Sequence, residues 1–342
     1  MSTPVTAAVD TFRAYFYHKF GDCKDVLLLT DAAAPPPLLD THVRVKIVSS
    51  ATNPADVVFV EMAAFASSLL PQPPTANNPL RLGCDLSGIA VQVGADVTRF
   101  QVGDAVYGTA TFDGVGSFGE YLDIDAHLIA KKPDVLSFNH AAALALAGET
   151  SYEALVECIK LQPKERVLIL GASGGTGVFA VQIAKALGAF VIATTSFRNV
   201  DFVRSLGADE VIDYTKEDWG TALELHSIDG IYDCGVEPNA WNDRAQTVLK
   251  RSTGRFVTIG LMNDPIESPI GASWQRLFGR SDEAILAKLN ELVEAGKLVV
   301  PVDSVYPFEK LPEALERQKS RRARGKIIVE IGVEAAKADK QP

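Results

Sequence analysis

The chain contains few of the residues that build metal sites and disulfide frameworks. Its 342 residues include four cysteines and five histidines, and the cysteines are scattered, with no C-x-x-C pair. Such spacing is a poor basis for a zinc site or a set of disulfides, and it is typical of a reducing compartment. We therefore expect no bound metal and a cytosolic (cytoplasmic) protein.

A basic charge balance and a long apolar run are also missing. The formal net charge is −10 and the pI is about 5.1, whereas nucleic-acid-binding proteins usually carry a basic surface. The one basic run, residues 321–326, is short. No apolar stretch approaches the roughly 20 residues of a membrane-spanning helix, and the first ten residues lack the apolar core of a secretory signal. We expect neither a nucleic acid nor a membrane as partner.

The most informative segment that is present, residues 166–195, places a glycine-rich turn between apolar runs. Residues 167–170 show no polar alternation, which predicts a strand covered on both faces. Ala172, Gly174 and Gly177 then stand in the frame of the G-x-G-x-x-G fingerprint, with Ala in place of the first Gly. The pattern predicts a strand that leads through a tight turn into a helix.

A helix and a second strand complete this unit. Apolar residues recur at helical spacing over 178–187, Gly188 can end the helix, and residues 190–195 form a second apolar strand. Absent side chains let the backbone approach a pyrophosphate, and the helix N-terminus offers free N–H groups. We expect a dinucleotide to bind here. The alternative is a glycine turn that only closes a strand–helix–strand crossover and binds no ligand. The predicted contacts are Ala172, Ser173, Gly174, Gly175, Thr176 and Gly177.

The end of the second strand indicates which dinucleotide binds. An NAD site usually has Asp or Glu there, to accept hydrogen bonds from the ribose 2′-hydroxyl. Here Thr195 is followed by Ser196 and Arg198, with no acid before Asp201. A hydroxyl and a guanidinium suit a 2′-phosphate instead. We therefore expect NADPH; the alternative is that Arg198 is only a solvated residue.

A β-rich part precedes this unit, and alternating helices and strands follow it. Residues 42–48 alternate polar and apolar side chains, as in a half-buried strand. Residues 60–80 predict a long loop, or a short helix and a loop. A helical pattern runs from 139 to 160, and Ser281 and Gly296 can cap a later helix. Other strands are predicted over 88–93, 103–108, 210–212, 230–234, 255–259 and 326–331, and a helix over 201–206.

Short motifs stand along the chain in a fixed order: NPAD (53–56), GCDLSG (83–88), GDAV (103–106), GSFGEY (116–121), ETSY (149–152), the glycine turn, LGAD (206–209) and GKII (325–328). In number and order they resemble the zinc-free branch of the medium-chain dehydrogenase/reductase superfamily, the quinone oxidoreductase (zeta-crystallin-like) group.

The resemblance implies an α/β protein of two domains. A β-rich GroES-like catalytic domain takes residues 1–130, a Rossmann domain with a doubly wound parallel sheet takes 131–297, and residues 298–342 return to the catalytic domain and end in a tail. NADPH lies in the cleft between the domains. Members of this group commonly pair through their cofactor domains, so we expect a homodimer.

The resemblance also implies chemistry without zinc. The zinc-using branch carries Gly-His-Glu where this chain has Gly83-Cys84-Asp85, and its four-cysteine loop is missing here. Without a Lewis acid the acceptor must itself take up a hydride readily. Quinones and α,β-unsaturated carbonyls do so, and the protein then mainly positions the reactants and excludes water.

Asn53 is the catalytic residue that the resemblance predicts, beside the nicotinamide and the substrate. Its amide would donate to a carbonyl oxygen; the alternative is an Asn that only holds the turn before Pro54. Some bacterial relatives have a Tyr shortly after this stretch, whereas residues 57–60 are VVFV. This leaves a tyrosine proton donor in doubt, and it makes the pocket more apolar, which favours a bulky hydrophobic acceptor.

Five further cofactor contacts follow from the resemblance. Thr150 matches a Thr near the nicotinamide ribose. Tyr214 matches a Tyr near the 2′-phosphate, and Arg321 matches a basic residue that reaches the same phosphate. Cys234 and Gly235 close the strand that passes the nicotinamide, although Cys234 can also be a buried small residue without a role.

The first functional hypothesis is NADPH-dependent reduction of quinones by hydride transfer. The alternative within enzymes is reduction of the C=C bond of an enone or enoyl thioester. An acyl-carrier partner would need a basic docking face, which the net charge of −10 does not favour. A hypothesis of another class is a non-enzymatic NADPH-binding sensor.

Overall fold

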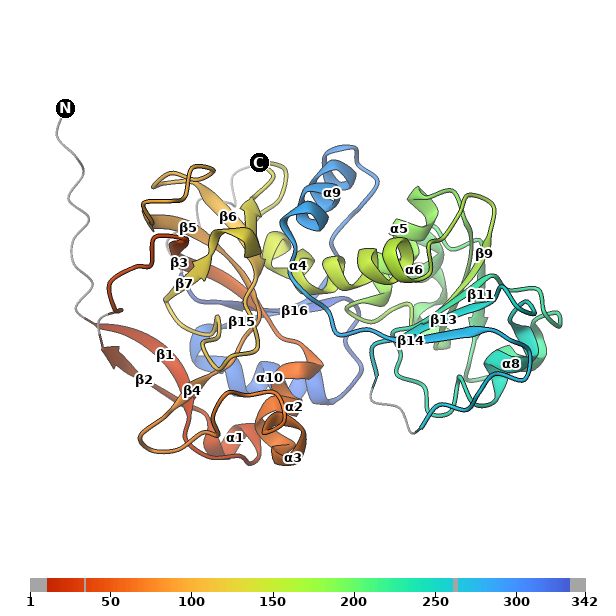
Figure 1. Ribbon diagram of the computed structural model, residues 1–342, viewed down its shortest axis with the longest axis horizontal. Helices are drawn as coiled ribbons and strands as arrows, with labels where there is room; N and C mark the ends of the chain where they lie inside the picture. The colour runs from red at the N-terminus through yellow and green to blue at the C-terminus, as the bar shows by residue number, and fades with distance from the viewer. Residues whose placement is uncertain (1–10, 34, 261–263, 333–342) are drawn as a thin grey trace.

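A parallel sheet of six strands forms one side of the molecule, which the computed structural model describes over residues 11–33, 35–260 and 264–332 (Figure 1). In spatial order the strands are β11, β10, β9, β12, β13 and β14, and all neighbours are parallel. This order is that of a doubly wound dinucleotide-binding domain with β9 as its first strand. The bounds are β9 (Arg166–Leu170), β10 (Phe190–Thr195), β11 (Glu210–Asp213), β12 (Gly230–Asp233), β13 (Arg255–Thr258) and β14 (Ser273–Arg276).

Helices cover both faces of this sheet. Val167 and Ile169 of β9 pack in one buried cluster with α4 and α5, and Leu168 and Leu170 pack in another with α7 and α8. This confirms the prediction of a strand covered on both faces, and it explains why the run has no polar alternation. The helical segments that follow strands here are α5 (Gly177–Ala186), η3 (Phe197–Asn199), α6 (Val200–Ser205), α7 (Trp219–Ala222) and α8 (Arg244–Val248).

A mixed sheet forms the other side and takes its strands from both ends of the chain. The order is β15, β16, β3, β5, β6, β8, and β7 also pairs with β3. Strand β16 runs antiparallel to β3, with Ile328 opposite Ala51, so a strand from the C-terminal part joins the sheet of the N-terminal part. The bounds are β3 (His42–Ala51), β5 (Asp85–Val93), β6 (Ala105–Thr109), β7 (Tyr121–Asp125), β8 (Ile129–Lys131), β15 (Val302–Pro307) and β16 (Lys326–Glu330).

One long helix, α4 (Phe138–Tyr152), crosses the middle of the molecule and contacts elements of both sides (Figure 1). It packs against β3, β5 and β6 of the mixed sheet, and against α5 and α9. It continues as a π-helical segment, η2 (Glu153–Cys158), within the range 139–160 where the sequence predicted a helical pattern. Such π segments are frequent at functional sites. Helix α4 therefore places its last turn between the two sheets.

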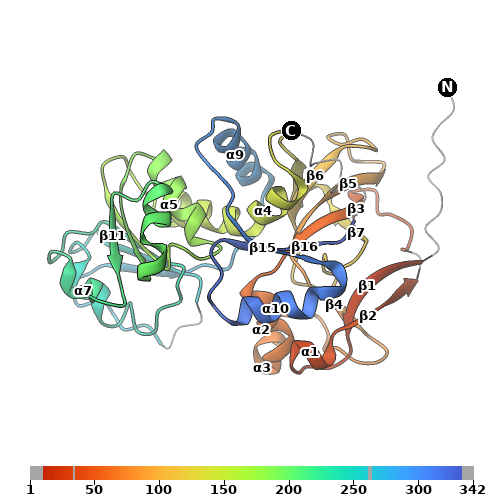
Figure 2. The same ribbon diagram turned by 180° about the vertical axis from the view of Figure 1, so that it is seen from behind.

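The remaining elements surround the catalytic domain, and Figure 2 shows α10 beside α2 on its rear face. A third sheet has the order β2, β1, β4. Helix α9 packs against α4 and β8. The bounds are β1 (Thr11–Tyr17), α1 (Cys23–Val26), β2 (Leu28–Ala33), α2 (Pro54–Glu61), α3 (Ala63–Ala66), β4 (Leu80–Arg81), η1 (Ala126–Leu128), α9 (Glu283–Glu294), η4 (Phe308–Lys310) and α10 (Leu311–Lys319).

Two local predictions differ from the structure. Asp282, not Ser281, caps α9, because its carboxylate accepts the N–H of Ala284, while the Ser281 hydroxyl lies 3.1 Å from both Leu128 O and Glu149 Oε1. The edge strand β14 was not predicted, since its sequence SWQR has no apolar run. Gly296 does follow the end of α9 in a left-handed conformation, with φ of 66°.

The predicted domain bounds stay a prediction, although the sheets divide the chain in a similar way. The parallel sheet uses residues 166–276, and the mixed sheet uses 42–131 and 302–330. The predicted C-terminal tail, residues 333–342, lies outside the described residues. Within the described part of the chain, no helix is both long and apolar enough to cross a membrane.

Candidate functional site

The glycine turn lies at the carboxyl end of β9, against the end of β12. Gly171 has a φ of 73°, and a Cβ there would come within 2.6 Å of Gly235 Cα. A Cβ on Gly177 would lie 2.4 Å from Gly171 O, so the helix can pack on the strand only with glycine at this position. At Gly174 the nearest neighbour would be Gly171 O at 3.3 Å. This one contact is tight, but Gly174 is the least crowded of the three glycines, so packing gives a weaker reason for glycine there than at Gly171 or Gly177.

Free N–H groups of α5 face the same turn. Among the described residues, no acceptor bonds the N–H groups of Gly175, Thr176 or Gly177. They begin a ten-residue helix, whose N-terminus carries the positive end of the helix dipole. An open backbone surface with unpaired donors fits a pyrophosphate. The residues present thus fit the diphosphate part of a dinucleotide.

The two glycines predict different outcomes on substitution. Gly174→Val should stay folded, because its Cβ would contact only Gly171 O, at 3.3 Å, yet it should lose NADPH affinity because its side chain would occupy the expected pyrophosphate position. Gly177→Val should lower the free energy of unfolding, since its side chain collides with the backbone of Ala172. Circular dichroism, thermal unfolding and fluorescence titration measure these effects. Wild-type NADPH affinity in Gly174→Val would show that the turn has only a structural role.

Hydroxyl and basic side chains gather where β10 and β11 end. Ser173 Oγ accepts from Thr195 Oγ1 at 3.0 Å and from Asn199 Nδ2 at 3.1 Å. The N–H of Tyr214 donates to Thr195 O, which places Tyr214 beside the end of β10. Arg198 is exposed and has no ion-pair partner among the described residues. The structure therefore brings Ser173, Arg198 and Tyr214 to one edge of the sheet, and Ser196 lies in the same turn.

The basic C-terminal run reaches this edge through residues that sequence reasoning did not single out. The N–H of Gly325 donates to Ser173 O at 3.0 Å. The guanidinium of Arg324 lies over the ring of Phe202 in α6, with 4.7 Å from Cζ to the ring centroid. The predicted contact Arg321 is exposed and follows the end of α10, and its role at the 2′-phosphate stays a prediction.

A buried ion pair lies directly after Gly325. Lys326 and Asp85 have side chains that are 3% and 0% exposed, and Lys326 Nζ lies 2.9 Å from Asp85 Oδ2. The ammonium also donates to Asn53 Oδ1 at 2.5 Å and to Thr52 O at 3.2 Å, so all three of its hydrogens have acceptors. The same side chain supports the glycine turn, because a Cβ on Gly175 would lie 3.1 Å from Lys326 Cδ.

Asn53 lies just before α2, and both the oxygen and the nitrogen of its side-chain amide make hydrogen bonds. Its Oδ1 accepts from Lys326, and its Nδ2 donates to Asp85 Oδ2 at 2.8 Å. Its main-chain N–H donates to Asp56 Oδ2 at 2.7 Å, which fixes the start of the helix at Pro54. These bonds favour a residue that positions the turn. The second amide hydrogen has only Ala51 O at 3.5 Å, so donation to an acceptor carbonyl stays a prediction.

The last turn of α4 connects Asp85 with Thr150. The N–H of Leu146 donates to Asp85 Oδ1 at 2.7 Å, and Leu146 O accepts from Thr150 Oγ1 at 2.6 Å. Glu149 accepts from Thr109 Oγ1 at 2.6 Å, and burial raises the pKa of Glu149 to about 8. Because the folded state then holds a proton that the unfolded state has lost, this group's contribution to stability falls as pH rises from about 4.5 to about 8.

The thiols near the site are neutral. Cys234 Sγ donates to Leu170 O at 2.9 Å, and burial raises the pKa of the Cys234 thiol. Burial also raises the pKa of the Cys84 thiol. Cys234 is half-buried, and these contacts favour the interpretation of a small packing residue without a role of its own, beside the exposed Gly235. Within the described ranges, no three or more Cys, His, Asp and Glu residues form a group able to hold a metal ion.

A small cavity with aromatic walls lies next to Asn53 in the catalytic domain. Phe59 of α2 stacks on Phe112, with 5.0 Å between ring centroids. Asp56 lines the cavity, and burial raises its pKa to about 7. Tyr17 of β1 lines this cavity too. A tyrosine is therefore present beside the cavity, although residues 57–60 contain none.

Known proteins are similar to this chain over nearly its whole length. The family described as "Alcohol dehydrogenase GroES-like domain" matches residues 39–134, and the one described as "Zinc-binding dehydrogenase" matches 206–329. A tomato 2-methylene-furan-3-one reductase is 34% identical over 93% of this chain and 78% of its own length. A spinach chloroplastic quinone-oxidoreductase homolog is 31% identical over 94% of this chain and 99% of its own length.

Solved structures agree. The quinone oxidoreductase from Coxiella burnetii superposes with a TM-score of 0.81 at 26% identity, covering 94% of this chain and 99% of that one. This chain belongs to the zinc-free, quinone oxidoreductase-like group of the medium-chain dehydrogenase/reductase family. It is therefore a nicotinamide-dependent oxidoreductase with a GroES-like and a Rossmann domain. Because some relatives are named as chloroplastic or mitochondrial, the cytosolic location stays a prediction.

Proposed function

We propose that this oxidoreductase uses NADPH to reduce a conjugated carbonyl compound, in the first place a quinone. The observation that carries the proposal is the position of Lys326. Its side chain supports the glycine turn on one side and holds Asn53, beside the aromatic cavity, on the other. Bound NADPH supplies a hydride, and one proton from solvent or a side chain completes the conversion of a quinone to its hydroquinone.

The end of β10 supports NADPH over NADH. Ser196 and Arg198 stand where an NAD site has a carboxylate, and the guanidinium of Arg198 is available to a phosphate. Arg324 brings a second cation toward the same edge through its contact with Phe202. A relative from Arabidopsis thaliana, 30% identical over 93% of this chain, is named an NADPH-dependent alkenal/one oxidoreductase.

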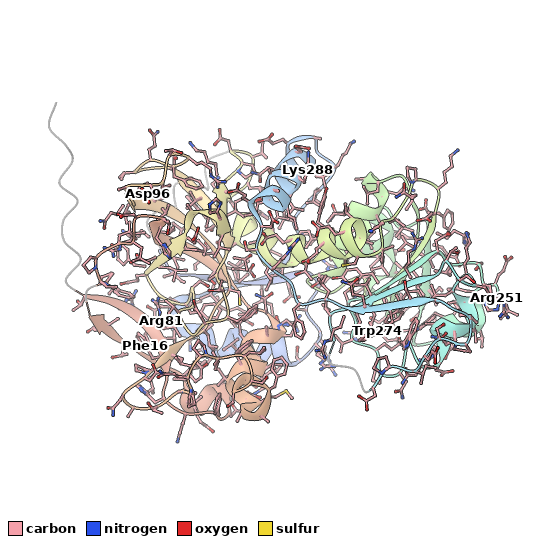
Figure 3. All side chains as sticks on the ribbon, viewed as in Figure 1. Phe16, Arg81, Asp96, Arg251, Trp274 and Lys288 are labelled. Atoms are coloured by element: carbon pink, nitrogen blue, oxygen red, sulfur yellow. The ribbon has the colours of Figure 1, made fainter. Side chains whose placement is uncertain are left out.

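Substitution of Arg198 tests this choice of cofactor. Arg198→Gln should weaken NADPH binding by about 1.5–3 kcal/mol, the value of a hydrogen bond to a charged group, and should leave NADH affinity nearly unchanged. Fluorescence titration with both cofactors measures it. Arg251→Gln is a matched control, because Arg251 is exposed at the far end of the same domain (Figure 3). Equal affinity of the wild-type protein for NADPH and NADH would contradict the proposal.

The donor set supports reduction without zinc. Where the zinc-using branch has Gly-His-Glu, this chain has a Cys84 thiol whose pKa is raised by burial, and an Asp85 carboxylate already paired with Lys326. A neutral thiol is a poor metal ligand, and the ammonium supplies the positive charge beside Asp85. The acceptor must then be activated by its own conjugation.

The aromatic rings of α2 and its neighbours favour an aromatic or conjugated acceptor, although the cavity that they line measures only about 20 Å³ and has to widen to admit one. The stacked rings of Phe59 and Phe112 offer flat apolar contact. Asp56 lines the same cavity and has a pKa near 7, so it can hold or release a proton close to neutral pH. The amide hydrogen of Asn53 that has only the distant Ala51 O as acceptor, at 3.5 Å, is the group that would orient the carbonyl oxygen.

The names of two relatives favour a second candidate, reduction of the C=C bond of an enone. They are the tomato 2-methylene-furan-3-one reductase and the Arabidopsis alkenal/one oxidoreductase. Both reactions need a hydride donor next to a conjugated carbonyl, so the contacts described above serve either one. Quinone reduction and enone reduction therefore differ only in the acceptor that receives the hydride.

An assay of NADPH oxidation with a para-quinone, an enone and a medium-chain enoyl thioester tests the proposal. The quinone should give the highest kcat/KM. Asn53→Ala should lower kcat with it by about 1–3 kcal/mol, or roughly 5- to 150-fold, because one hydrogen bond to the acceptor is lost. Asn78→Ala is the control, since Asn78 bonds only within its own exposed turn.

Each other outcome selects a different hypothesis. Robust enone or enoyl-thioester reduction with negligible quinone turnover would replace the first candidate by the second. Tight NADPH binding without turnover of any of the three acceptors would favour the hypothesis of a non-enzymatic NADPH-binding sensor.

We further propose that two copies pair through their cofactor domains. In the described part of the chain, β14 pairs only with β13, so one side of β14 is a free sheet edge. Main-chain groups on such an edge can pair with a second copy of the same strand.

A further inference from the structure

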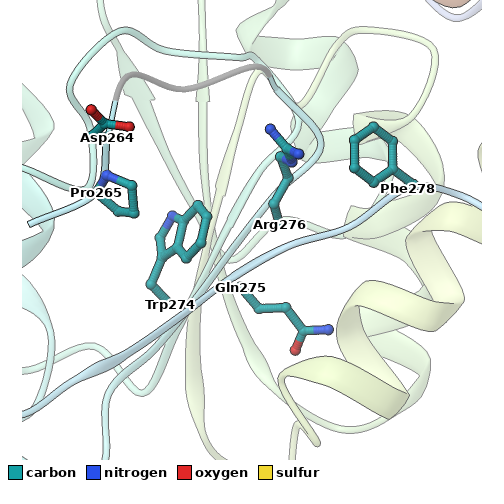
Figure 4. Close-up of a pocket in the computed structure, with 6 residues that line it drawn as sticks. All are labelled: Asp264, Pro265, Trp274, Gln275, Arg276 and Phe278. Carbon is teal, nitrogen blue, oxygen red and sulfur yellow. The ribbon is translucent and has the colours of Figure 1, made fainter. Parts of the chain in front are cut away.

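The last strand of the parallel sheet forms one wall of a second cavity. Trp274 and Arg276 extend to one side of β14, toward Asp264 and Pro265, and Gln275 extends to the other (Figure 4). Together with Phe278, these residues line a cavity of about 480 Å³. That volume lies within the range of small-molecule sites.

One lining residue of this cavity, Phe278, lies near Thr150, the residue expected beside the nicotinamide ribose. The N–H of Leu277 donates to Thr258 O, so β14 ends beside the end of β13. Ligands of doubly wound sheets bind at the carboxyl ends of the strands. Gly279, next to Phe278, packs so closely on Thr150 that a Cβ there would lie 2.4 Å from Thr150 Oγ1. Phe278 is therefore one residue away from a contact with Thr150.

The side chains of the cavity combine aromatic surface with an available cation. The guanidinium of Arg276 lies over the ring of Phe278, with 4.6 Å from Cζ to the ring centroid. Among the described residues it makes no ion pair. Asp264 is the one acidic residue of the wall, and it does not pair with Arg276. A guanidinium on an aromatic face suits a carboxylate joined to a flat ring.

We propose that this cavity is a subsite for acceptors that carry an anionic group, and that Arg276 binds a carboxylate on an aromatic acceptor. Phe278 lies beside this carboxylate position, under the Arg276 guanidinium. The proposal rests on the proposed function, since it assigns a substrate class to the same reaction. It makes the enzyme prefer a carboxylated quinone over its neutral parent.

Binding of a compound that cannot be reduced tests the subsite apart from the reaction. Calorimetric titration with 2-naphthoate and with neutral 2-naphthamide should show that the wild-type protein prefers the carboxylate. Arg276→Gln should weaken 2-naphthoate at least about tenfold, equal to about 1.4 kcal/mol, and leave 2-naphthamide unchanged. Arg251→Gln, with an equally exposed arginine far from the cavity, should change neither.

Kinetics with matched acceptors complete the test. The ratio of kcat/KM for 1,4-naphthoquinone-6-carboxylate to that for 1,4-naphthoquinone should fall at least about tenfold in Arg276→Gln and not in Arg251→Gln. Arginine-dependent 2-naphthoate binding without reduction of either quinone would keep the subsite and refute the proposed reaction. Quinone reduction with the same ratio and the same 2-naphthoate affinity in both variants would refute the subsite and keep the reaction.

Arg276 lies on the free edge of the sheet, where a second copy could pair. The oligomeric state of each variant therefore has to be measured as well. Sedimentation should give the same mass for wild-type protein and Arg276→Gln, and their thermal unfolding should coincide. A changed mass together with weaker 2-naphthoate binding would assign Arg276 to an interface between copies and overturn the subsite.

Discussion

A lysine and an aspartate buried out of water hold the two halves of this site together. Burying an isolated charge is costly, and an ion pair in the interior is tolerated only where hydrogen bonds satisfy its remaining atoms. Lys326 meets this condition with Thr52, Asn53 and Asp85, and Asp85 meets it with Leu146 N and Asn53. The cluster therefore has one arrangement in which every partner is matched. That arrangement fixes β16, β5, α2 and α4 relative to one another.

Function follows from what this cluster touches. Gly325 bonds Ser173 in the glycine turn, and the next residue, Lys326, supports that turn at Gly175 and holds Asn53. The expected cofactor and acceptor positions are thus linked by two consecutive residues of the chain. Thr150 is connected to Asp85 through a single turn of α4. A hydride can pass only between closely placed atoms, so rigid positioning is what the protein has to supply.

The sequence predicted the features that depend on local pattern. The apolar run of β9, the glycine turn and the left-handed Gly188 are all present, because periodicity and backbone conformation are local properties. It did not predict the role of Lys326, since lysines are rarely buried and nothing in GKII shows that an acid from a distant strand lies opposite. Tyr17 was missed for the same reason: it reaches the cavity from β1 through tertiary packing. Long-range pairing of polar groups leaves no periodic signal in the sequence.

The most direct test of this account is a double-mutant cycle on the ion pair, with the free energy of unfolding and quinone turnover measured on each protein. Lys326→Met and Asp85→Leu should each lower stability by about 3–5 kcal/mol, because each leaves a buried charge unpaired. The double variant should regain much of that stability but not the turnover, since Asn53 has lost both partners. Single variants as stable and as active as the wild-type protein would contradict the claim that this pair holds the site together.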